Sequence, residues 1–231
     1  MKLKFILCWS LLLNFIIIQA QQMQKVVASF GGGSLGSIEI YTEEFVFFLT
    51  ENGSISGFTT NNFNGSFDYH DNEHFEKEKY GKLKNCGDTK IEYWLTFNVN
   101  DARYGKVKSI GKVTIDYWDN HNYEKEKFGR VKNIGTIPVD YWDRDGFDTA
   151  RYGKIKNIGN IFVDYWENEP LNKAKYGKIK SFGPVKFDYW DNYYSDKEKF
   201  GKLKSVTGNS DKIQVKFNHL LFYQTSNYQP Y

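Results

Sequence analysis

The fold is decided by one stretch of the chain, Tyr152-Gly153-Lys154-Ile155-Lys156-Asn157-Ile158-Gly159-Asn160-Ile161-Phe162-Val163-Asp164-Tyr165-Trp166. This stretch is one copy of a unit that recurs every 24 residues. The same glycine position recurs without a slip at Gly81, Gly105, Gly129, Gly153, Gly177 and Gly201. A Tyr-Trp pair keeps the same spacing at Tyr93-Trp94, Tyr117-Trp118, Tyr141-Trp142, Tyr165-Trp166 and Tyr189-Trp190. Such strict repetition is typical of arrays in which each unit packs on its neighbours.

Each unit contains two segments with the alternation of a β-strand. In the second segment, 161–166, one face is apolar and the other carries an acid. The apolar face of this copy consists of Ile161, Val163 and Tyr165. Gly159 lies between the two segments and favours a tight hairpin turn. The period of two, the regular glycines and the aromatic content of 18% all favour strands over helices. The sequence therefore predicts an all-β fold.

The apolar pattern also predicts which residues face each other across a hairpin, because facing residues share a face of the sheet. We expect the pairs Ile155 and Val163, Lys154 and Asp164, Gly153 and Tyr165, and Tyr152 and Trp166. In these pairs opposite charges attract, a tyrosine covers a glycine backbone, and two aromatic rings stack. Each pair contributes ~0.2–1 kcal/mol, so repetition rather than strength defines the register.

About seven units are predicted between residues 53 and 218, as an antiparallel meander that forms a long twisted or curled sheet. A closed barrel and a β-solenoid are the alternatives. The first unit is degenerate and has His70 where the others have tryptophan. The last unit begins near Phe200, is interrupted at 207–211, and resumes as a strand over 213–217. Atypical terminal units are expected because they have one neighbour only.

The first 20 residues have the features of a secretory signal peptide. Lys2 and Lys4 precede an apolar run from Phe5 to Ile18, and Ala20 ends it. The run is 14 residues long, whereas a membrane-spanning helix needs ~20. We therefore expect a secreted, periplasmic or cell-surface protein with no membrane span in the mature chain. Residues 21–52 are expected to form N-terminal lead-in strands, and residues 219–231 a C-terminal tail.

After cleavage one cysteine remains, Cys86, which excludes an intramolecular disulfide. Cys86 takes the position of Ile110 and Ile134 in later units, so we expect it to be a buried apolar substitute. The net charge of +3 gives no indication of nucleic-acid binding.

The repeats resemble the short β-hairpin repeats of secreted bacterial proteins, of the MORN-like type. The resemblance covers residues 53–218 and rests on the Tyr-Gly-Lys-aliphatic-Lys run, the turn glycine and the Asp-Tyr-Trp run. The Tyr-x-Gly-x-Trp spacing of MORN units is absent here. The resemblance implies a binding or scaffolding array and carries over no catalytic residue.

The tryptophans are the best candidates for a functional surface. The candidate binding residues are Trp94, Trp118, Trp142, Trp166 and Trp190, with Tyr152 beside Trp166. A row of indole rings on a polar face can stack on sugar rings or contact a protein. The alternative is that the rings lie over lysine stems and tyrosine rings and serve stability.

Nothing in the sequence predicts an enzyme. A glycosidase needs one distinctive carboxylate pair, whereas the acids here occur alike in every unit. No spacing typical of a metal site occurs, and we expect neither a metal nor a cofactor.

The sequence predicts a secreted, non-enzymatic repeat protein that binds or scaffolds through an aromatic and charged sheet face. A glycan and a cell-surface protein are the candidate partners. The alternative function is that of a purely structural cell-envelope protein with no small ligand. An outer-membrane barrel is disfavoured because the expected strands of five to seven residues are shorter than the ~9–11 that a span requires.

Overall fold

The computed structural model describes residues 23–31, 34–60, 63–75, 77–119, 125–144, 149–168, 173–195 and 197–219. The predicted signal peptide and all but the first residue of the predicted C-terminal tail lie outside these ranges. Within them the chain forms 17 strands and no helix, which confirms the predicted all-β fold. The described part of the chain therefore has no helix of the length and apolarity needed to cross a membrane.

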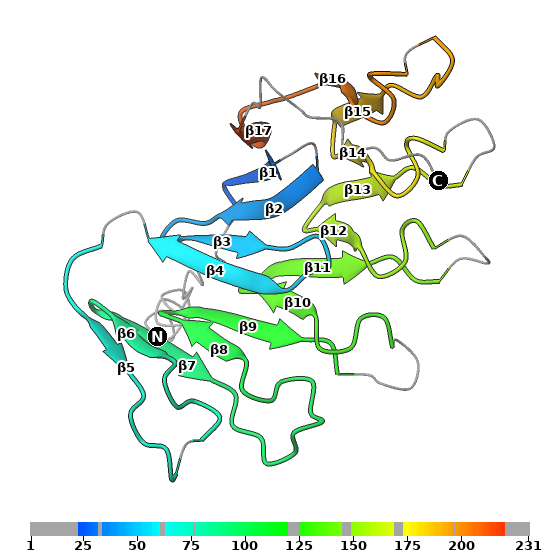
Figure 1. The fold of residues 1–231 in the computed structure, drawn as a ribbon. Helices are drawn as coiled ribbons and strands as arrows, with labels where there is room; N and C mark the ends of the chain where they lie inside the picture. Colours follow the sequence, from blue (N-terminus) through cyan, green and yellow to red (C-terminus); the bar gives the residue numbers. More distant parts are fainter. Residues whose placement is uncertain are drawn as a thin grey trace, which may run out of the picture.

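Twelve strands form one large antiparallel sheet in which each strand pairs with its neighbours in the sequence (Figure 1). The predicted meander is confirmed, and the sheet is open because β5 and β16 are its edge strands. The strands are β5 (Phe67–Tyr69), β6 (Leu83–Cys86), β7 (Thr89–Tyr93), β8 (Val107–Ile110), β9 (Val113–Tyr117), β10 (Val131–Ile134), β11 (Ile137–Tyr141), β12 (Ile155–Ile158), β13 (Ile161–Tyr165), β14 (Ile179–Phe182), β15 (Val185–Tyr189) and β16 (Leu203–Thr207).

The remaining five strands form a smaller sheet in the order β17-β1-β2-β3-β4. They are β1 (Lys25–Gly31), β2 (Ser34–Tyr41), β3 (Phe45–Leu49), β4 (Ile55–Thr60) and β17 (Ile213–His219). Neighbours in this sheet are antiparallel except β17 and β1, which pair in parallel with Ile213 opposite Val26. The expected first and last units thus differ from the other repeats, because β4 and β17 belong to the smaller sheet and not to the array.

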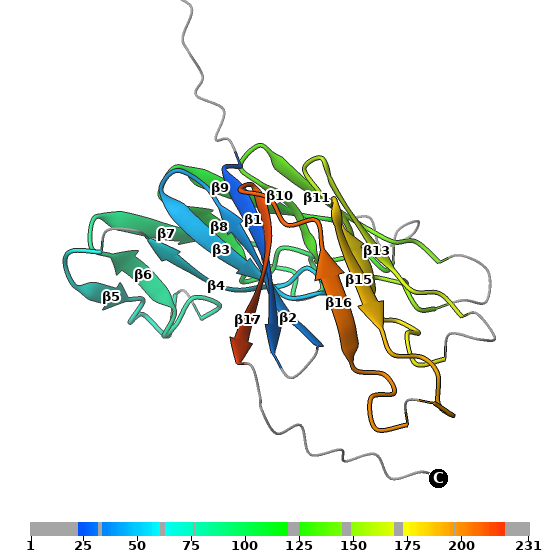
Figure 2. The same cartoon turned by 90° about the horizontal axis from the view of Figure 1, so that it is seen from above.

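The two sheets pack against each other and share one hydrophobic core (Figure 2). The large sheet contributes the predicted apolar face: Val163 and Tyr165 are fully buried, and Asp164 between them is half-buried. The small sheet contributes side chains such as Phe30, whose ring stacks on Phe187 with centroids 5.1 Å apart. Burying one large apolar side chain contributes ~1.5–3 kcal/mol. The N-terminal strands are therefore the second layer that covers the array.

Cys86 is buried in the same core and is a free thiol. Its place among apolar neighbours confirms the prediction that it substitutes for the isoleucine of the other units.

The predicted register within the hairpins is wrong by one residue. Ile158 pairs with Ile161, so that the turn consists of the two residues Gly159 and Asn160. Gly159 has a φ of +58°, and a positive φ at the first central residue is the requirement of a type II′ hairpin turn. The prediction placed three residues in the turn, and this error shifts every predicted pair of the hairpin by one residue.

A β-bulge in the first strand of each unit explains the rest of the difference. Between neighbouring units Asp140 pairs with Asn157 and Tyr141 with Ile155, so Lys156 is an extra residue. The two terminal isoleucines of β12 are buried, whereas the two residues between them face outward. The corresponding shift occurs at the other unit boundaries. The prediction failed here because it assumed uninterrupted alternation along this strand.

The turn between β3 and β4 fixes the small sheet onto the large one. The carbonyl oxygen of Gly53 accepts a hydrogen bond from the Val131 N–H at 3.3 Å and lies 3.4 Å from the Tyr141 hydroxyl, which donates to the Val131 carbonyl at 2.7 Å. The carbonyl oxygen of Glu51 accepts one from the Ile155 N–H at 3.1 Å. Gly53 has a φ of +77°, and a Cβ added there would lie 2.0 Å from the Tyr141 hydroxyl oxygen.

We therefore expect Gly53→Ala to lower the free energy of unfolding by about 2 kcal/mol or more, because it combines backbone strain with a clash against a buried ring. Urea unfolding followed by tryptophan fluorescence measures this change. Gly57→Ala is the matched control, since a Cβ added at Gly57 meets nothing within 4 Å. Equal effects of the two variants would contradict this account of the turn.

Candidate functional site

The five tryptophans of the predicted binding site form a column along the large sheet, each directly after the second strand of its unit. The backbone of Trp142 continues the pairing with the next unit: its N–H donates to Lys154 at 2.9 Å, and its carbonyl accepts from Gly153 at 2.9 Å. All five indole rings are half-buried. Trp94, Trp118, Trp142 and Trp166 also pack against the edge of the core.

Each indole ring lies against two cationic side chains. At Trp142 these are Arg151, 4.0 Å from the ring centroid, and Lys156, 5.1 Å from it. The other pairs are Arg103 and Lys108 at Trp94, Lys127 and Lys132 at Trp118, Lys175 and Lys180 at Trp166, and Lys199 and Lys204 at Trp190. One cation of each pair is the bulge residue, so the bulge presents a lysine to the preceding unit. Each contact contributes ~0.5–1 kcal/mol at an exposed site.

The indole N–H groups of three tryptophans tie neighbouring units together, whereas that of Trp166 is buried without a hydrogen-bond partner. The donor and acceptor pairs are Trp94 and the Ile115 carbonyl at 3.1 Å, Trp118 and the Val139 carbonyl at 3.2 Å, and Trp142 and the Val163 carbonyl at 3.0 Å. A half-buried ring with a hydrogen-bonded N–H and two cations against it helps to hold the array together.

The acids of the second strand have other partners than predicted. Asp164 forms ion pairs with Arg151 at 3.4 Å and with Lys180 at 3.6 Å, so the prediction that Lys154 faces Asp164 is wrong. The cation from the loop also contacts a second carboxylate of its unit. These sets are Arg103 with Asp116 and Asp119, Lys127 with Asp140 and Asp143, Arg151 with Asp164 and Glu167, and Lys175 with Asp188 and Asp191.

Lys154 lies against a tyrosine ring and not in the tryptophan column. Its ammonium group lies 4.6 Å from the centroid of the Tyr165 ring and donates a hydrogen bond to the carbonyl of Gly177 in the next unit. Likewise the guanidinium of Arg130 fills the space beside Gly153, where an added Cβ would lie 2.7 Å from it. The predicted cover of Gly153 by Tyr165 is therefore wrong, because the long side chain of the preceding unit takes that place.

Contrary to the prediction, Tyr152 does not join the tryptophan column. Its side chain is 41% exposed in the loop before β12, and the ring of Trp166 contacts Lys175 and Lys180 instead. The adjacent Gly153 pairs with Trp142, one unit earlier in the sequence. The predicted stack of Tyr152 on Trp166 is wrong because the hairpin register is shifted.

At Asp116 and Asp188 the ion pairs favour the charged form of the carboxyl and lower its pKa. Burial acts to raise the pKa of Asp188, but hydrogen bonds from Lys175 and Lys204 oppose it and leave that pKa below its usual value. The pKa of Asp116 is lowered in the same way, with burial opposed by a hydrogen bond from Arg103. Asp116 and Asp188 are therefore alike in electrostatic environment as well as in repeat position.

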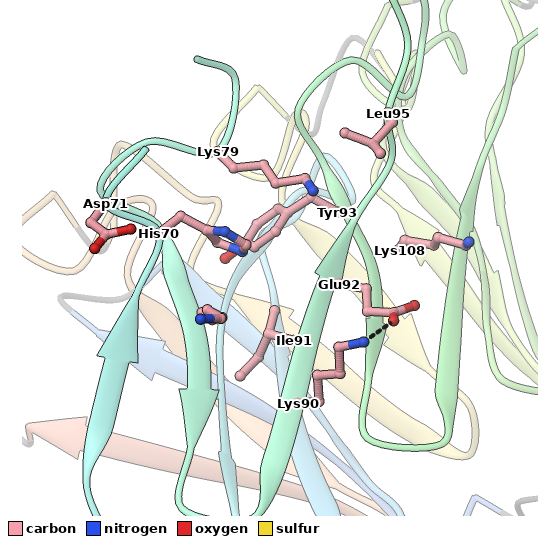
Figure 3. Close-up of a pocket in the computed structure, with 10 residues that line it drawn as sticks. His70, Asp71, Lys79, Lys90, Ile91, Glu92, Tyr93, Leu95 and Lys108 are labelled. Atoms are coloured by element: carbon pink, nitrogen blue, oxygen red, sulfur yellow. Dashed lines mark hydrogen bonds and ion pairs between the residues drawn. The ribbon is translucent and has the colours of Figure 1, made fainter. Parts of the chain in front are cut away.

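One cavity that the sequence did not predict lies at His70, the residue that takes the tryptophan position of the column in the first unit (Figure 3). It has a volume of about 420 Å³ and is lined by His70, Asp71, Lys79, Lys84, Lys90, Ile91, Glu92, Tyr93, Leu95 and Lys108. The rings of His70 and Tyr93 meet edge to face with centroids 5.8 Å apart. The signal in the sequence was the histidine at the tryptophan position of the first unit.

Exposed aromatic side chains on the long loops are a second feature that the sequence analysis missed. Phe75 is 87% exposed, Tyr194 is 97% exposed, and Phe97 is fully exposed. They lie on the β5–β6, β15–β16 and β7–β8 connections (Figure 1). A meander places these connections at the same end of its strands, which we call the loop edge of the sheet. The two-residue hairpin turns lie along the opposite edge.

Among the residues that the structure describes, no group of three or more His, Cys, Asp or Glu side chains is placed to hold a metal ion. No family model, curated protein or solved structure matches this chain.

We expect Trp142→Ala to lower the free energy of unfolding by about 2 kcal/mol, because it removes a half-buried ring, its hydrogen bond to the Val163 carbonyl and two cation contacts. Tyr152→Ala, which removes an exposed ring, is expected to change it by less than about 0.5 kcal/mol. Urea unfolding of both variants tests this. If Trp142→Ala were as neutral as Tyr152→Ala, the column would have no structural role.

Acid is expected to destabilise the fold. Because the folded-state pKa of Asp188 is lowered, its stabilising contribution is complete above the unfolded value of ~3.9 and is lost as pH falls through the folded pKa. We expect the urea midpoint to decrease below about pH 4, and less steeply in Asp188→Asn. Asp88→Asn, at an exposed turn, is the control. An unchanged slope in Asp188→Asn would contradict the assignment.

Proposed function

We propose that this chain is an exported, non-catalytic binding protein that holds a protein partner along the loop edge of its large sheet and the adjacent tryptophan and cation columns. The observation that carries the proposal is the exposure of Phe75, Phe97 and Tyr194 on that edge. Aromatic residues are enriched at the centres of protein interfaces.

The covered state of the tryptophan rings favours a protein partner over a glycan. A sugar stacks on a free ring face, whereas each indole already lies against two cations, at 4.0 and 5.1 Å from the ring centroid in the case of Trp142. In the proposed complex the column presents ammonium groups, carboxylates and ring edges. These groups fit a polar rim around the aromatic contacts.

The repeated ion pairs support a function without catalysis. A catalytic carboxylate is distinguished from its neighbours by its environment. Here Asp116 and Asp188 lie in equivalent pairs with a loop cation, at 2.9 and 2.8 Å. The array offers many similar contacts rather than one special group.

The test uses fluorescently labelled protein added to intact cells of the source organism. We expect retention that is removed by prior protease treatment of the cells and unaffected by glycosidase treatment. The triple variant Phe75→Ser, Phe97→Ser, Tyr194→Ser should lower retention at least tenfold without changing the unfolding midpoint, since all three side chains are exposed.

The matched control replaces three exposed residues of the opposite edge, Asp88→Ser, Lys112→Ser and Asn160→Ser. Retention that survives the aromatic changes would contradict the proposal. Loss of retention after glycosidase treatment alone would indicate a glycan partner. An absence of retention in the unmodified protein would favour the purely structural function.

A further inference from the structure

The backbone at His70 is that of a normal repeat. The His70 N–H donates to the Lys82 carbonyl at 2.9 Å, and its own carbonyl accepts from Gly81 at 2.8 Å. Trp142 makes the equivalent bonds with Lys154 and Gly153, both at 2.9 Å. The first unit therefore differs from the others at this position in its side chain and not in its backbone hydrogen bonds. An imidazole, with one ring, stands where five other units have the two fused rings of an indole.

The groups that surround an indole in the other units are present around His70. Lys79 and Lys84 occupy the repeat positions of Arg103 and Lys108, the two cations that lie on Trp94. Both lysines line the cavity at His70. The site thus contains the two cationic positions that accompany each tryptophan ring of the column.

The hydrogen-bond acceptor is also in place. Ile91 occupies the repeat position of Ile115, whose carbonyl accepts the bond from the Trp94 indole N–H. Ile91 lines the cavity, as do His70 and Tyr93, whose rings meet each other (Figure 3). The cavity of about 420 Å³ lies in the ~300–1,000 Å³ range of small-molecule sites.

The charge of this cavity differs from that of the other units. Leu95 stands where Asp119, Asp143, Glu167 and Asp191 supply the second acid. Glu92 is held by Lys90 at 2.7 Å. The lining contains four lysines and two carboxylates, and Asp68 forms an ion pair with Lys84 at 3.3 Å, which leaves an excess of one positive charge among the lysines and acids. A ligand with a carboxylate complements this excess.

We propose that the gap left by His70 in the tryptophan column is a binding site for a planar aromatic carboxylate, and that an indole ring is the ring that fits it. The ring lies between Lys79 and Lys84 with its N–H directed to the Ile91 carbonyl, and its carboxylate meets the remaining lysines. The gap lies in the tryptophan column that the proposed protein partner also contacts, but this inference does not depend on that partner, because it rests on the groups around His70 and not on the exposed aromatic side chains of the loops.

The test is isothermal titration of the full mature chain with indole-3-acetate. We expect saturable one-to-one binding that is weakened at least tenfold in His70→Trp, because the new side chain fills the gap. The same variant should raise the thermal unfolding midpoint, since it completes the column. His74→Trp makes the same chemical change at an exposed loop position and should alter neither result.

Two further measurements separate the ring from the charge. Cyclohexylacetate carries the carboxylate without an aromatic ring, and indole carries the ring without the charge. Both should bind at least tenfold more weakly than indole-3-acetate. Lys84→Glu reverses one charge of the lining and should also weaken binding at least tenfold, which keeps the test decisive if His70→Trp does not fold. No binding to the unmodified chain, or equal binding to His70→Trp, would overturn the proposal.

Discussion

The whole structure depends on covering the apolar face of a twelve-stranded sheet. An open sheet of this size with one apolar face is not stable by itself in water. Here the small sheet supplies the cover, and Phe30 stacked on Phe187 is one of its contacts. The β3–β4 turn then reaches the large sheet, where Gly53 meets Tyr141. The repeat array and the strands outside it are therefore one folding unit with one core.

The outer face follows from how neighbouring units are joined. A bulge places one lysine in each unit on the tryptophan of the preceding unit, and a loop cation covers the same ring. A second lysine column, represented by Lys154 on Tyr165, donates to the glycine of the following unit. Each contact is weak, but it recurs in most units, and together these contacts fix the spacing of the array. Tryptophan in this column is first a structural residue.

Regularity of this kind makes departures informative. The position of His70 was visible in the sequence as an exception, but its meaning came from the geometry of the other units. At Trp94, Trp118 and Trp142 the indole ring lies against two cations and donates a hydrogen bond to one backbone carbonyl. The exposed aromatic residues of the loops are a second departure, since Phe97 and Tyr194 contribute nothing to the core. The proposed functional surfaces of this protein therefore lie where the repeat is interrupted, at His70, and where its loops expose aromatic side chains to solvent.

The sequence by itself determined the local features: the strands, the buried face of each second strand, the meander and the atypical terminal units. These follow from alternation and spacing, which are properties of short segments. The tertiary structure decided the second layer, because the pairing of Val26 with Ile213 joins segments at opposite ends of the chain. It also decided the register, the partners of Asp164 and the cavity at His70. A bulge of one residue moves side chains to new neighbours, and the two polar residues between Ile155 and Ile158 do not by themselves show which strand pair carries it.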